Sequence, residues 1–506
     1  MYYDDENRGY EPPWHPPKNA FENEALCADT LRGIFADCTD FTSRTLHPGA
    51  RESLTASFFF LDGLVSGSEA AETVLRPATD LLRLGSAKSE AEALDLILSG
   101  QVYGVTAQRI DAVSDAVTAL LNGFVLLVFD GIGQAAAFEA RTSNHRSIDE
   151  PKSEQSIKGA RDSFVETLRI NTSLLRRHLR SSALKFEKTS LGRKTNTRAE
   201  LVWVDGVADP ALLEKLRLRL AAVDVDGVLT ASAVESALAD TPRSPFPQLL
   251  LTERPDRFCL NLLEGRVGLL VDGLPFGWLL PATVTQQLRV TDDVSRHPLT
   301  SSALTLLRHL ALLVTVLFPA LYVAIAMYHQ EMIPVRLLLS VIESKQSVPF
   351  STAVEVLGML VAFELLQEAG LRLPSAVGET VSIIGALIVG QSAVEAKVIS
   401  PIAVIVVATA GIAGYTIPDQ DLSEALRLTR FFLVLAAIGA GMFGIAAGCI
   451  LLLWHLCSLD SFGVAYLAPA ADGGIRELLR ALTQPPQSRL KFRDRRLHTP
   501  DVRRRK

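Results

Sequence analysis

The chain has 506 residues, 48% of them hydrophobic, and a formal net charge of -6. An acidic balance argues against a nucleic-acid-binding protein, which needs a strongly positive surface. The hydrophobic residues are unevenly distributed: the first ~300 residues are mixed in character, whereas the stretch from Leu304 to His455 is strongly apolar. We therefore treat the two parts separately.

The first 39 residues are predicted to be a disordered lead followed by a short helix. The stretch from Met1 to Asn19 is acidic, rich in proline and without an apolar core, so it does not have the pattern of a secretory signal peptide. We therefore expect the N-terminal region to stay in the cytoplasm. No Cys-x-x-Cys spacing is present, so we expect reduced, structural thiols and neither a metal site nor a cofactor. The five cysteines are Cys27, Cys38, Cys259, Cys449 and Cys457.

Four short apolar runs with the composition of buried strands each end in Asp-Gly. Asp-Gly favours a turn, because glycine takes a positive φ without steric cost. An aspartate at a strand end could also be catalytic or bind magnesium, but four copies at equivalent places favour turn chemistry. No phosphate-binding loop, HExxH or GxSxG motif is present to support a catalytic role for these aspartates. The four turns are Asp62–Gly63, Asp130–Gly131, Asp205–Gly206 and Asp272–Gly273.

The spacing of these turns indicates an internal repeat. Asp62 and Asp130 are 68 positions apart, and Asp205 and Asp272 are 67 apart. The run 121–131 also matches the run 263–273, with a glycine eight positions before the last one in both. We predict two related α/β subdomains, at 40–150 and 199–298. Between them we predict a basic helical linker at 151–198, which is either solvated or a docking surface for a neighbouring subunit or acidic lipid headgroups.

Residues 299–470 are predicted to form an α-helical transmembrane bundle. A helix needs about 20 apolar residues to span a bilayer, and three uncharged runs come close: 310–328 with 19 residues, 398–418 with 21 and 431–454 with 24. The segments 350–369 and 380–394 are less certain, because the first contains three glutamates and the second has 15 uncharged residues. We predict four crossings plus one partial segment, the last crossing at 431–455, and an amphipathic interfacial helix at 335–347.

Polar residues in this half are the candidate functional residues. An ionised side chain at the bilayer centre costs about 2.5–3.5 kcal/mol or more, so such residues face protein or water. Glu364 and Glu368 are four residues apart and share a helix face, and so do Gln391 and Glu395. We predict that these four residues line a pore or gate. The alternative is an interfacial helix with solvated acids.

Residues 471–506 are predicted to be a basic cytoplasmic tail. From Arg489 to Lys506 there are nine lysines and arginines against two aspartates. A basic segment after the last membrane helix usually stays on the cytoplasmic side. The tail is either solvated or in contact with anionic lipids.

Long stretches of the chain, from about Asp40 to Pro469, resemble the GerA family of spore germination proteins. This family contains the A subunits of germinant receptors and their SpoVAF-type relatives. Among the stretches that carry the resemblance are FVETLRINTSLLRRHL, VPFSTAVEVLGMLVAFELLQEAGLRLP, VSIIGALIVGQSAVEAKVISP and LCSLDSFGVAYLAP.

The resemblance implies an integral protein of the spore inner membrane that is not an enzyme. It implies a homo-oligomer that conducts monovalent cations at the start of germination and contacts membrane lipids. It also implies two partners, a transporter-like B subunit and a lipoprotein C subunit. Two alternatives remain: a scaffold that conducts nothing and assembles the other subunits, and a secondary transporter. The internal repeat of this chain lies in the soluble half, whereas secondary transporters commonly have repeats in the membrane half. This difference argues against the transporter.

Overall fold

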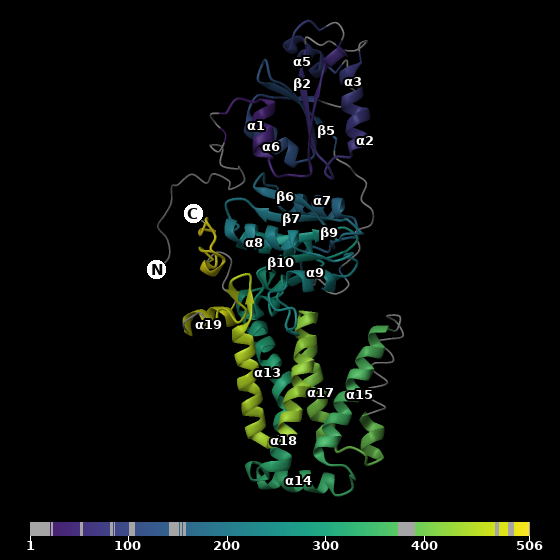
Figure 1. The fold of residues 1–506 in the computed structure, drawn as a ribbon, viewed down its shortest axis with the longest axis vertical. Coiled ribbons are helices and arrows are strands. Elements are labelled where there is room, and N and C mark those ends of the chain that lie inside the picture. The colour runs from purple at the N-terminus through teal and green to yellow at the C-terminus, as the bar shows by residue number, and fades with distance from the viewer. Residues whose placement is uncertain are drawn as a thin grey trace.

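Along its longest axis, the molecule consists of two α/β subdomains followed by a helical bundle (Figure 1). The N-terminal stretch predicted to be disordered, up to residue 20, lies outside the described residues, and so does most of the segment 380–394. This computed structural model describes residues 24–50, 54–80, 87–100, 107–140, 158–372, 390–470, 475–483 and 490–504, together with residues 21, 84, 151 and 154.

The first subdomain is an antiparallel five-stranded sheet with the strand order β1-β2-β4-β5-β3. Along one strand, Phe58 and Phe60 belong to one hydrophobic cluster and Phe59 and Leu61 to another, because successive side chains point to opposite faces. Both faces are buried, so the strand is apolar except for Ser57, which is itself buried. The strands are β1 (Phe41–Leu46), β2 (Ala56–Leu61), β3 (Ala107–Ile110), β4 (Phe124–Phe129) and β5 (Gln134–Glu139). The helical elements are α1 (Ala28–Ile34), η1 (Pro48–Ala50), α2 (Gly67–Ala70), η2 (Ala71–Leu75), α3 (Arg76–Thr79), α5 (Glu90–Leu98) and α6 (Val113–Leu121).

The second subdomain has a sheet with the same connections. Its strand order is β6-β7-β9-β10-β8, which becomes the order of the first sheet when five is subtracted from each number. Its strand pairs are antiparallel as well. This equivalence is what an internal duplication produces. The strands are β6 (Leu184–Leu191), β7 (Thr197–Val204), β8 (Leu250–Thr252), β9 (Val267–Val271) and β10 (Gly277–Leu280). The helices are α7 (Leu168–His178), α8 (Pro210–Ala221), α9 (Ala231–Leu238), α10 (Pro255–Glu264), α11 (Val284–Gln287) and α12 (Asp292–Ser295).

The prediction of a helical linker at 151–198 is wrong for most of that range. Helix α7 contributes to the core of the second subdomain, and β6 is the edge strand of its sheet. The charged residues Lys185, Glu187 and Lys188 made β6 resemble a solvated segment in the sequence. Edge strands tolerate such residues, because one side of an edge strand has no neighbouring strand.

Buried polar contacts join the two subdomains. Arg176 of α7 and Asp40, just before β1, are each 1% exposed, and Nε and Nη2 of the arginine donate to the carboxylate at 2.7 and 3.0 Å. Lys185 Nζ donates to the carbonyls of Ile34 and Ala36 at 2.7 and 3.0 Å, beside the C-terminal end of α1. Carbonyls at a helix end lack partners within the helix, so a lysine there satisfies them. These contacts fix the relative position of the subdomains, because breaking them would leave buried charges unpaired.

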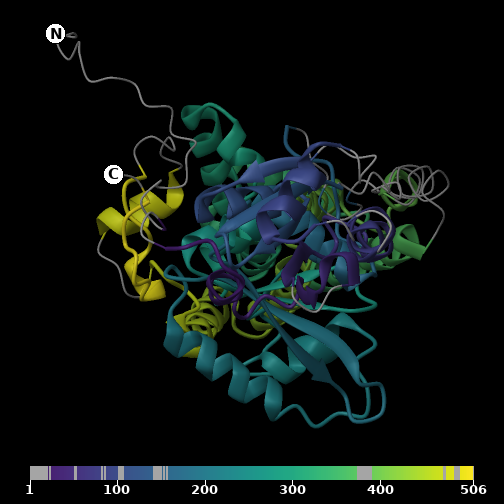
Figure 2. The ribbon, with the colours of Figure 1, turned by 90° about the horizontal axis from the view of Figure 1, so that it is seen from above.

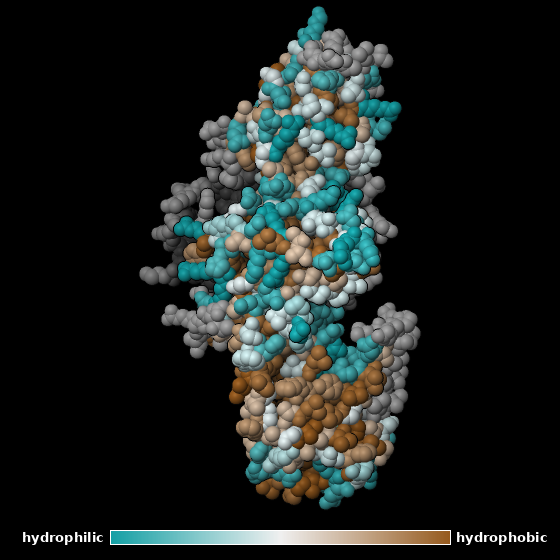
Figure 3. All heavy atoms as spheres, viewed as in Figure 1, coloured by the Kyte–Doolittle hydropathy of each residue, from teal (hydrophilic) through white to brown (hydrophobic). Residues whose placement is uncertain are grey.

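The C-terminal half is helical. Among the described helices, α13 (Pro298–Tyr328) and α18 (Gln420–Ser458) are long and apolar enough to cross a membrane, and α17 (Pro401–Tyr415) is apolar but shorter. After α13 comes the short η3 (Gln330–Met332), and α14 (Val335–Lys345) lies across the end of the bundle farthest from the subdomains (Figure 1). Helix α15 (Thr352–Arg372) follows. The visible surface of the bundle is mostly hydrophobic, whereas that of the subdomains is mixed (Figure 3).

Helix α18 is interrupted in its middle. Ala440 and Gly441 leave the helical region of φ and ψ, and Gly441 has φ 58° and ψ -137°. Residues other than glycine rarely adopt such a conformation. The interruption divides the helix into a first arm, residues 420–439, and a second arm, residues 442–458. At 1.5 Å per residue, these arms are about 30 Å and 25 Å long, so each has roughly the thickness of a bilayer core.

The two arms pack side by side in opposite directions. A Cβ atom added to Gly444 would collide with the carbonyl of Ala436, and one added to Gly448 would lie 2.6 Å from Cδ2 of Leu433. Residues eight apart in one straight helix would be separated by about 12 Å. The prediction that 431–455 is a single crossing is therefore wrong. Hydropathy could not reveal the turn, because the residues that form it are small and apolar.

The bundle is attached to the second subdomain at two helices. At the start of the bundle, Arg308 of α13 donates to the carboxylate of Asp293 in α12 at 2.5 and 3.0 Å, and Asp293 is 1% exposed. At its end, the ring of His455, in the second arm, forms a 3.0 Å hydrogen bond with the hydroxyl of Ser244. The hydroxyl of Ser461 then donates to a carbonyl of the second subdomain at 2.7 Å.

The C-terminal segment folds back onto the second subdomain. Arg504 forms an ion pair with Glu264 of α10 at 2.8 Å, and Nε of Arg493 donates to the carbonyl of Leu263 at 2.8 Å. The predicted tail is therefore docked through these two arginines, although most residues between 490 and 504 remain exposed. The elements after α18 are β11 (Asp460–Ser461), β12 (Val464–Ala465), α19 (Ile475–Leu482) and η5 (Arg495–Leu497).

The docked tail constrains the path of the chain. The α/β subdomains and the tail lie at the same end of the bundle, and the C-terminal segment and α15 are on opposite sides of the molecule (Figures 1 and 2). A bundle that enters and leaves at one end crosses a bilayer an even number of times. The docked tail and the subdomains thus have the placement that the prediction of an even number of crossings requires.

Candidate functional site

The three glutamates of α15 lie in different environments. Glu355 is 2% exposed, Glu364 is half-buried and Glu368 is exposed. Helix α15 begins beside α14, so Glu355 lies near the end of the bundle that is far from the subdomains. Glu364 lies about 14 Å further along the helix, closer to the subdomains. These acids therefore belong to two separate sites.

Glu364 is held by two arginines of the first arm of α18. Its Oε1 lies 2.5 Å from Nη2 of Arg430, and its Oε2 lies 3.2 Å from Nη1 of Arg427. Arg430 is 1% exposed, and both arginines are on the face of the arm that meets α15. We call these three residues the Glu364 cluster. Two positive charges face one negative charge, so the acid predicted to line a pore is already neutralised in this conformation.

The two arginines are not among the residues that we predicted from the sequence. The predicted membrane segment begins at Phe431, directly after Arg430, so both arginines lie outside it. The available signal was their spacing, because residues three apart share a helix face. An Arg-x-x-Arg pattern beside a long apolar run, with an unpaired acid on another apolar helix, predicts such an ion pair.

Gln391 and Glu395 form a separate pair. Nε2 of Gln391 donates to Oε1 of Glu395 at 2.8 Å, and both side chains are exposed. Glu368 lies one turn after Glu364 on α15 and is exposed as well. The structure thus does not gather the four predicted pore residues around one point of a single chain. Only Glu364 lies in a partly buried polar cluster.

Glu355, the first of the three acids along α15, is the most buried of them. Its Oε2 accepts the backbone N–H of Ser400 at 2.8 Å, and Ser400 is the N-cap of α17. The positive end of a helix dipole stabilises a carboxylate in this position. Nζ of Lys345, in α14, lies 3.7 Å from Oε1 of the same carboxylate.

The four Asp-Gly turns follow β2, β4, β7 and β9. Gly63, Gly206 and Gly273 have positive φ values of 98°, 74° and 88°. In the remaining turn, the positive φ belongs to Gly133 instead of Gly131.

Two of the aspartates also tie a helix to a sheet. Asp130 accepts the N–H of Ala28 at 2.7 Å, at the start of α1, and Asp272 accepts the N–H of Leu168 at 3.0 Å, at the start of α7. The contacts are equivalent, because each connects the strand-end aspartate of one subdomain to its first helix. Capping of a distant helix accounts for these two aspartates without a catalytic or metal-binding role.

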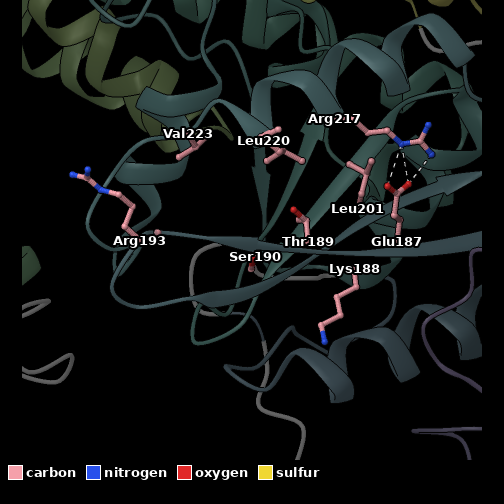
Figure 4. A pocket seen from close by; sticks show the side chains of 11 residues that line it. Glu187, Lys188, Thr189, Ser190, Arg193, Leu201, Arg217, Leu220 and Val223 are labelled. Carbon is pink, nitrogen blue, oxygen red and sulfur yellow. Dashed lines mark hydrogen bonds and ion pairs between the residues drawn. The ribbon is translucent and has the colours of Figure 1, made fainter.

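A cavity of about 340 Å³ lies between the β6–β7 hairpin and α8 (Figure 4). At one side, Arg217 donates from Nε and Nη2 to the carboxylate of Glu187 at distances of 2.6–3.2 Å. The hydrogen bonds that Arg217 donates to the carboxylate of Glu187 raise the pKa of Arg217. The close-up shows Arg193 and Lys188 directed away from this pair. Because the two charged groups satisfy each other, the cavity offers no unpaired charge from this pair to a ligand.

Metal-ligating side chains are not clustered in the part of the chain that the structure describes. No group of three or more histidine, cysteine, aspartate or glutamate residues there could hold a metal ion.

Comparisons with known proteins find similarity over most of the chain. The family model described as "Bacillus/Clostridium GerA spore germination protein" matches residues 29–496. The membrane protein YfkQ of Bacillus subtilis is 37% identical over 441 residues, which cover 87% of this chain and 84% of that protein. Spore germination protein KA of Bacillus subtilis is 34% identical over 459 residues, which cover 91% and 84%. The crystal structure of the N-terminal domain of the A subunit of the Bacillus megaterium spore germinant receptor GerK3 is 27% identical, covers 50% of this chain and 91% of that chain, and has a TM-score of 0.38.

Proposed function

The chain belongs to the GerA family of spore germination proteins, and from this premise we propose that it is the membrane subunit of a spore germinant receptor that conducts ions. In this proposal, several copies form a channel that releases monovalent cations at the start of germination. The matched region, residues 29–496, includes both subdomains and the bundle. The family resemblance predicted from the sequence is confirmed, and it makes the chain a spore membrane protein.

The observation that carries the channel proposal is the presence of charged groups inside an apolar bundle. Glu355 and the Glu364 cluster lie among helices that are apolar over long stretches, and Glu355 and Arg430 are almost completely buried. Charged groups in such surroundings are expensive and are retained mainly where they serve ions or protons. Acidic groups near a path favour cations over anions.

Membership of the family supports a proposal for the partners and the location. We propose that the chain works with a transporter-like B subunit and a lipoprotein C subunit in the spore inner membrane. The subdomains and the tail would lie in the cytoplasm, because a basic segment beside the last helix favours that side. The named relatives are spore germination proteins, which fits a protein that is not an enzyme.

The test is potassium efflux from liposomes that contain the purified full-length protein. Wild type is compared with Glu364→Gln and with Glu343→Gln, a control that removes an exposed acid of α14 outside the predicted pore residues. Glu364→Gln removes the carboxylate that pairs with buried Arg430, whereas Arg427 keeps its second ion pair with Glu424. We therefore expect cation efflux to fall about tenfold, the equivalent of 1.4 kcal/mol. The control should keep the wild-type rate. An efflux equal to that of protein-free liposomes would overturn the channel proposal.

A scaffold that conducts nothing is the second candidate. It is favoured by one observation, the neutralisation of Glu364 by Arg427 and Arg430, because ion pairs of this kind also serve to hold helices together. A scaffold gives no efflux alone but is needed for efflux when the B and C subunits are present. Uptake of a solute against a gradient would instead indicate the secondary transporter.

A further inference from the structure

We propose that Glu355, Ser400 and Tyr322 form a binding site for a monovalent cation, and that Lys345 occupies this site as a tethered substitute in the present conformation. The site lies at the end of the bundle where α13, α14, α15 and α17 meet. The choice of potassium as the cation rests on the proposed function; the existence of the site rests on the geometry.

The carboxylate of Glu355 has one satisfied oxygen and one unsatisfied oxygen. The side chain is 0% exposed. Oε2 accepts the N–H of Ser400, whereas Oε1 has no hydrogen-bond donor among the described groups. The ammonium of Lys345, at 3.7 Å, is at the outer limit of an ion pair. A buried anionic oxygen without a donor is costly, so this oxygen favours a closely bound positive charge.

Three residues with hydroxyl groups lie in the neighbourhood of this carboxylate. The hydroxyl of Tyr322 lies close to Ser400 and has no hydrogen-bond partner among the described groups. Ser400 is completely buried, and Thr352, which is 3% exposed, contacts Nζ of Lys345 through its hydroxyl. Carboxylate and hydroxyl oxygens are the ligands that hard cations prefer. A single carboxylate supplies one negative charge, which balances a monovalent cation and leaves a divalent one with an excess of charge.

Lys345 is able to leave the site, whereas Glu355 is not. The lysine is the last residue of α14, and its side chain is 24% exposed. Its ammonium can move outward to water, while the carboxylate stays fixed on α15. An entering cation would take the place of the ammonium and release the last turn of α14 from α15. The site is thus an exchange between a tethered cation and a free one.

A purely structural role makes a different prediction. If Lys345 and Glu355 only fasten α14 to α15, replacing the lysine destabilises the protein equally in every salt. If they form a cation site, the protein without the lysine ammonium regains stability in potassium but not in choline, which is too large to enter.

The experiment is thermal unfolding of the full-length protein in lipid nanodiscs, in potassium chloride and in choline chloride at equal ionic strength. We expect the midpoint of Lys345→Met to be higher in potassium by about 2–4 °C, because a bound ligand stabilises the folded state. We expect no difference between the salts when Glu355→Gln is added to Lys345→Met. Equal midpoints of Lys345→Met in the two salts would overturn the proposal.

A second measurement needs no variant of the buried pair. Potassium should release Lys345 in the wild-type protein, so its rate of acylation by an amine-reactive reagent, followed by mass spectrometry, should rise about threefold over the rate in choline. Tyr322→Phe removes one ligand and should require more potassium for the same rise. A rate that is the same in both salts would count against the site.

Both readouts report binding and not conduction. A protein that shows the potassium effects but no efflux keeps the cation site and loses the channel. A protein that conducts but shows neither effect keeps the channel and loses this site.

Discussion

The carboxylate of Glu364 on α15 accepts a 2.5 Å hydrogen bond from the guanidinium of Arg430 on the first arm of α18. The arginine is 1% exposed, and its Nε has no hydrogen-bond partner among the described groups. The acid is therefore the principal counter-charge of a buried cation. Losing a partner of a buried pair costs more than the pair contributes, because the remaining charge is left without compensation.

Glu364→Gln should therefore lower the free energy of unfolding by about 2 kcal/mol, which is less than the loss of a completely buried pair because Glu364 is 25% exposed. Glu368→Gln, on the exposed side, should change it by less than about 0.5 kcal/mol. Thermal unfolding in nanodiscs measures both. Adding Arg430→Gln to Glu364→Gln should recover part of the loss, and equal losses for the two single variants would contradict the ion-pair assignment.

The hairpin of α18 depends on Gly441. A Cβ there would lie 3.1 Å from Tyr328 and would require a backbone conformation that costs an L-residue about 1–3 kcal/mol. Gly441→Ala should lower the midpoint of unfolding accordingly. Gly439→Ala is the matched control, because no atom lies within 4 Å of its added Cβ and alanine favours a helix by about 0.5–1 kcal/mol. If Gly441→Ala were as stable as Gly439→Ala, the turn could not be where the structure has it.

The contact between Arg176 and Asp40 should hold the two subdomains together. Arg176→Met leaves a buried aspartate without its partner and should cost about 3–5 kcal/mol. The loss should speed hydrogen exchange at the amides of Thr39 and Phe186, which take part in backbone hydrogen bonds between the subdomains. Arg193→Met, at a side chain 65% exposed, is the control and should leave this exchange unchanged. Protection that survives Arg176→Met would show that the apolar contacts suffice.

Stability should depend on pH through Glu200, which is 5% exposed between the subdomains. Burial raises its pKa, although the hydroxyls of Thr172 and Thr39, which donate to its two oxygens, oppose the shift. Its contribution to stability is therefore complete below the ordinary pKa of about 4.3 and is lost as pH rises through the raised pKa of the folded state.

Glu200→Gln should therefore unfold at a higher temperature than wild type at pH 8, with a difference that shrinks as pH falls toward 4. Denaturation midpoints across this range measure the effect. Glu214→Gln, at a side chain 62% exposed, is the control, and its difference from wild type should not follow the same course. If the midpoint of Glu200→Gln differed from that of wild type by the same amount at every pH, a raised pKa of Glu200 would be excluded.

The sequence predicted those strands that have a local signal. The four apolar runs that end in Asp-Gly are β2, β4, β7 and β9. Strands β4 and β9 are the middle strands of the two sheets, and β2 and β7 lie between them and an edge strand. Strand β6 was missed, because an edge strand carries charges that resemble a linker. The caps from Asp130 to α1 and from Asp272 to α7 connect residues 102 and 104 positions apart, so no local pattern could reveal them.

The candidate site was predictable only in part. Glu364 could be found, because an acid in an apolar helix is conspicuous. Its partners could not be found, since pairing between helices depends on the rotation of each helix about its axis. Glu355 was passed over for the same reason: the sequence could not place Ser400 and Lys345 beside it.

The two attachments of the bundle to the second subdomain, through Arg308 and Asp293 at its start and through His455 and Ser244 near its end, have a mechanical consequence. A body joined at one point can swivel without disturbing what it is joined to. A body joined at two points transmits torque. A rotation of the soluble part about the long axis of the molecule therefore shears α13 against the second arm of α18, and the strain passes into the helices that carry the buried charges.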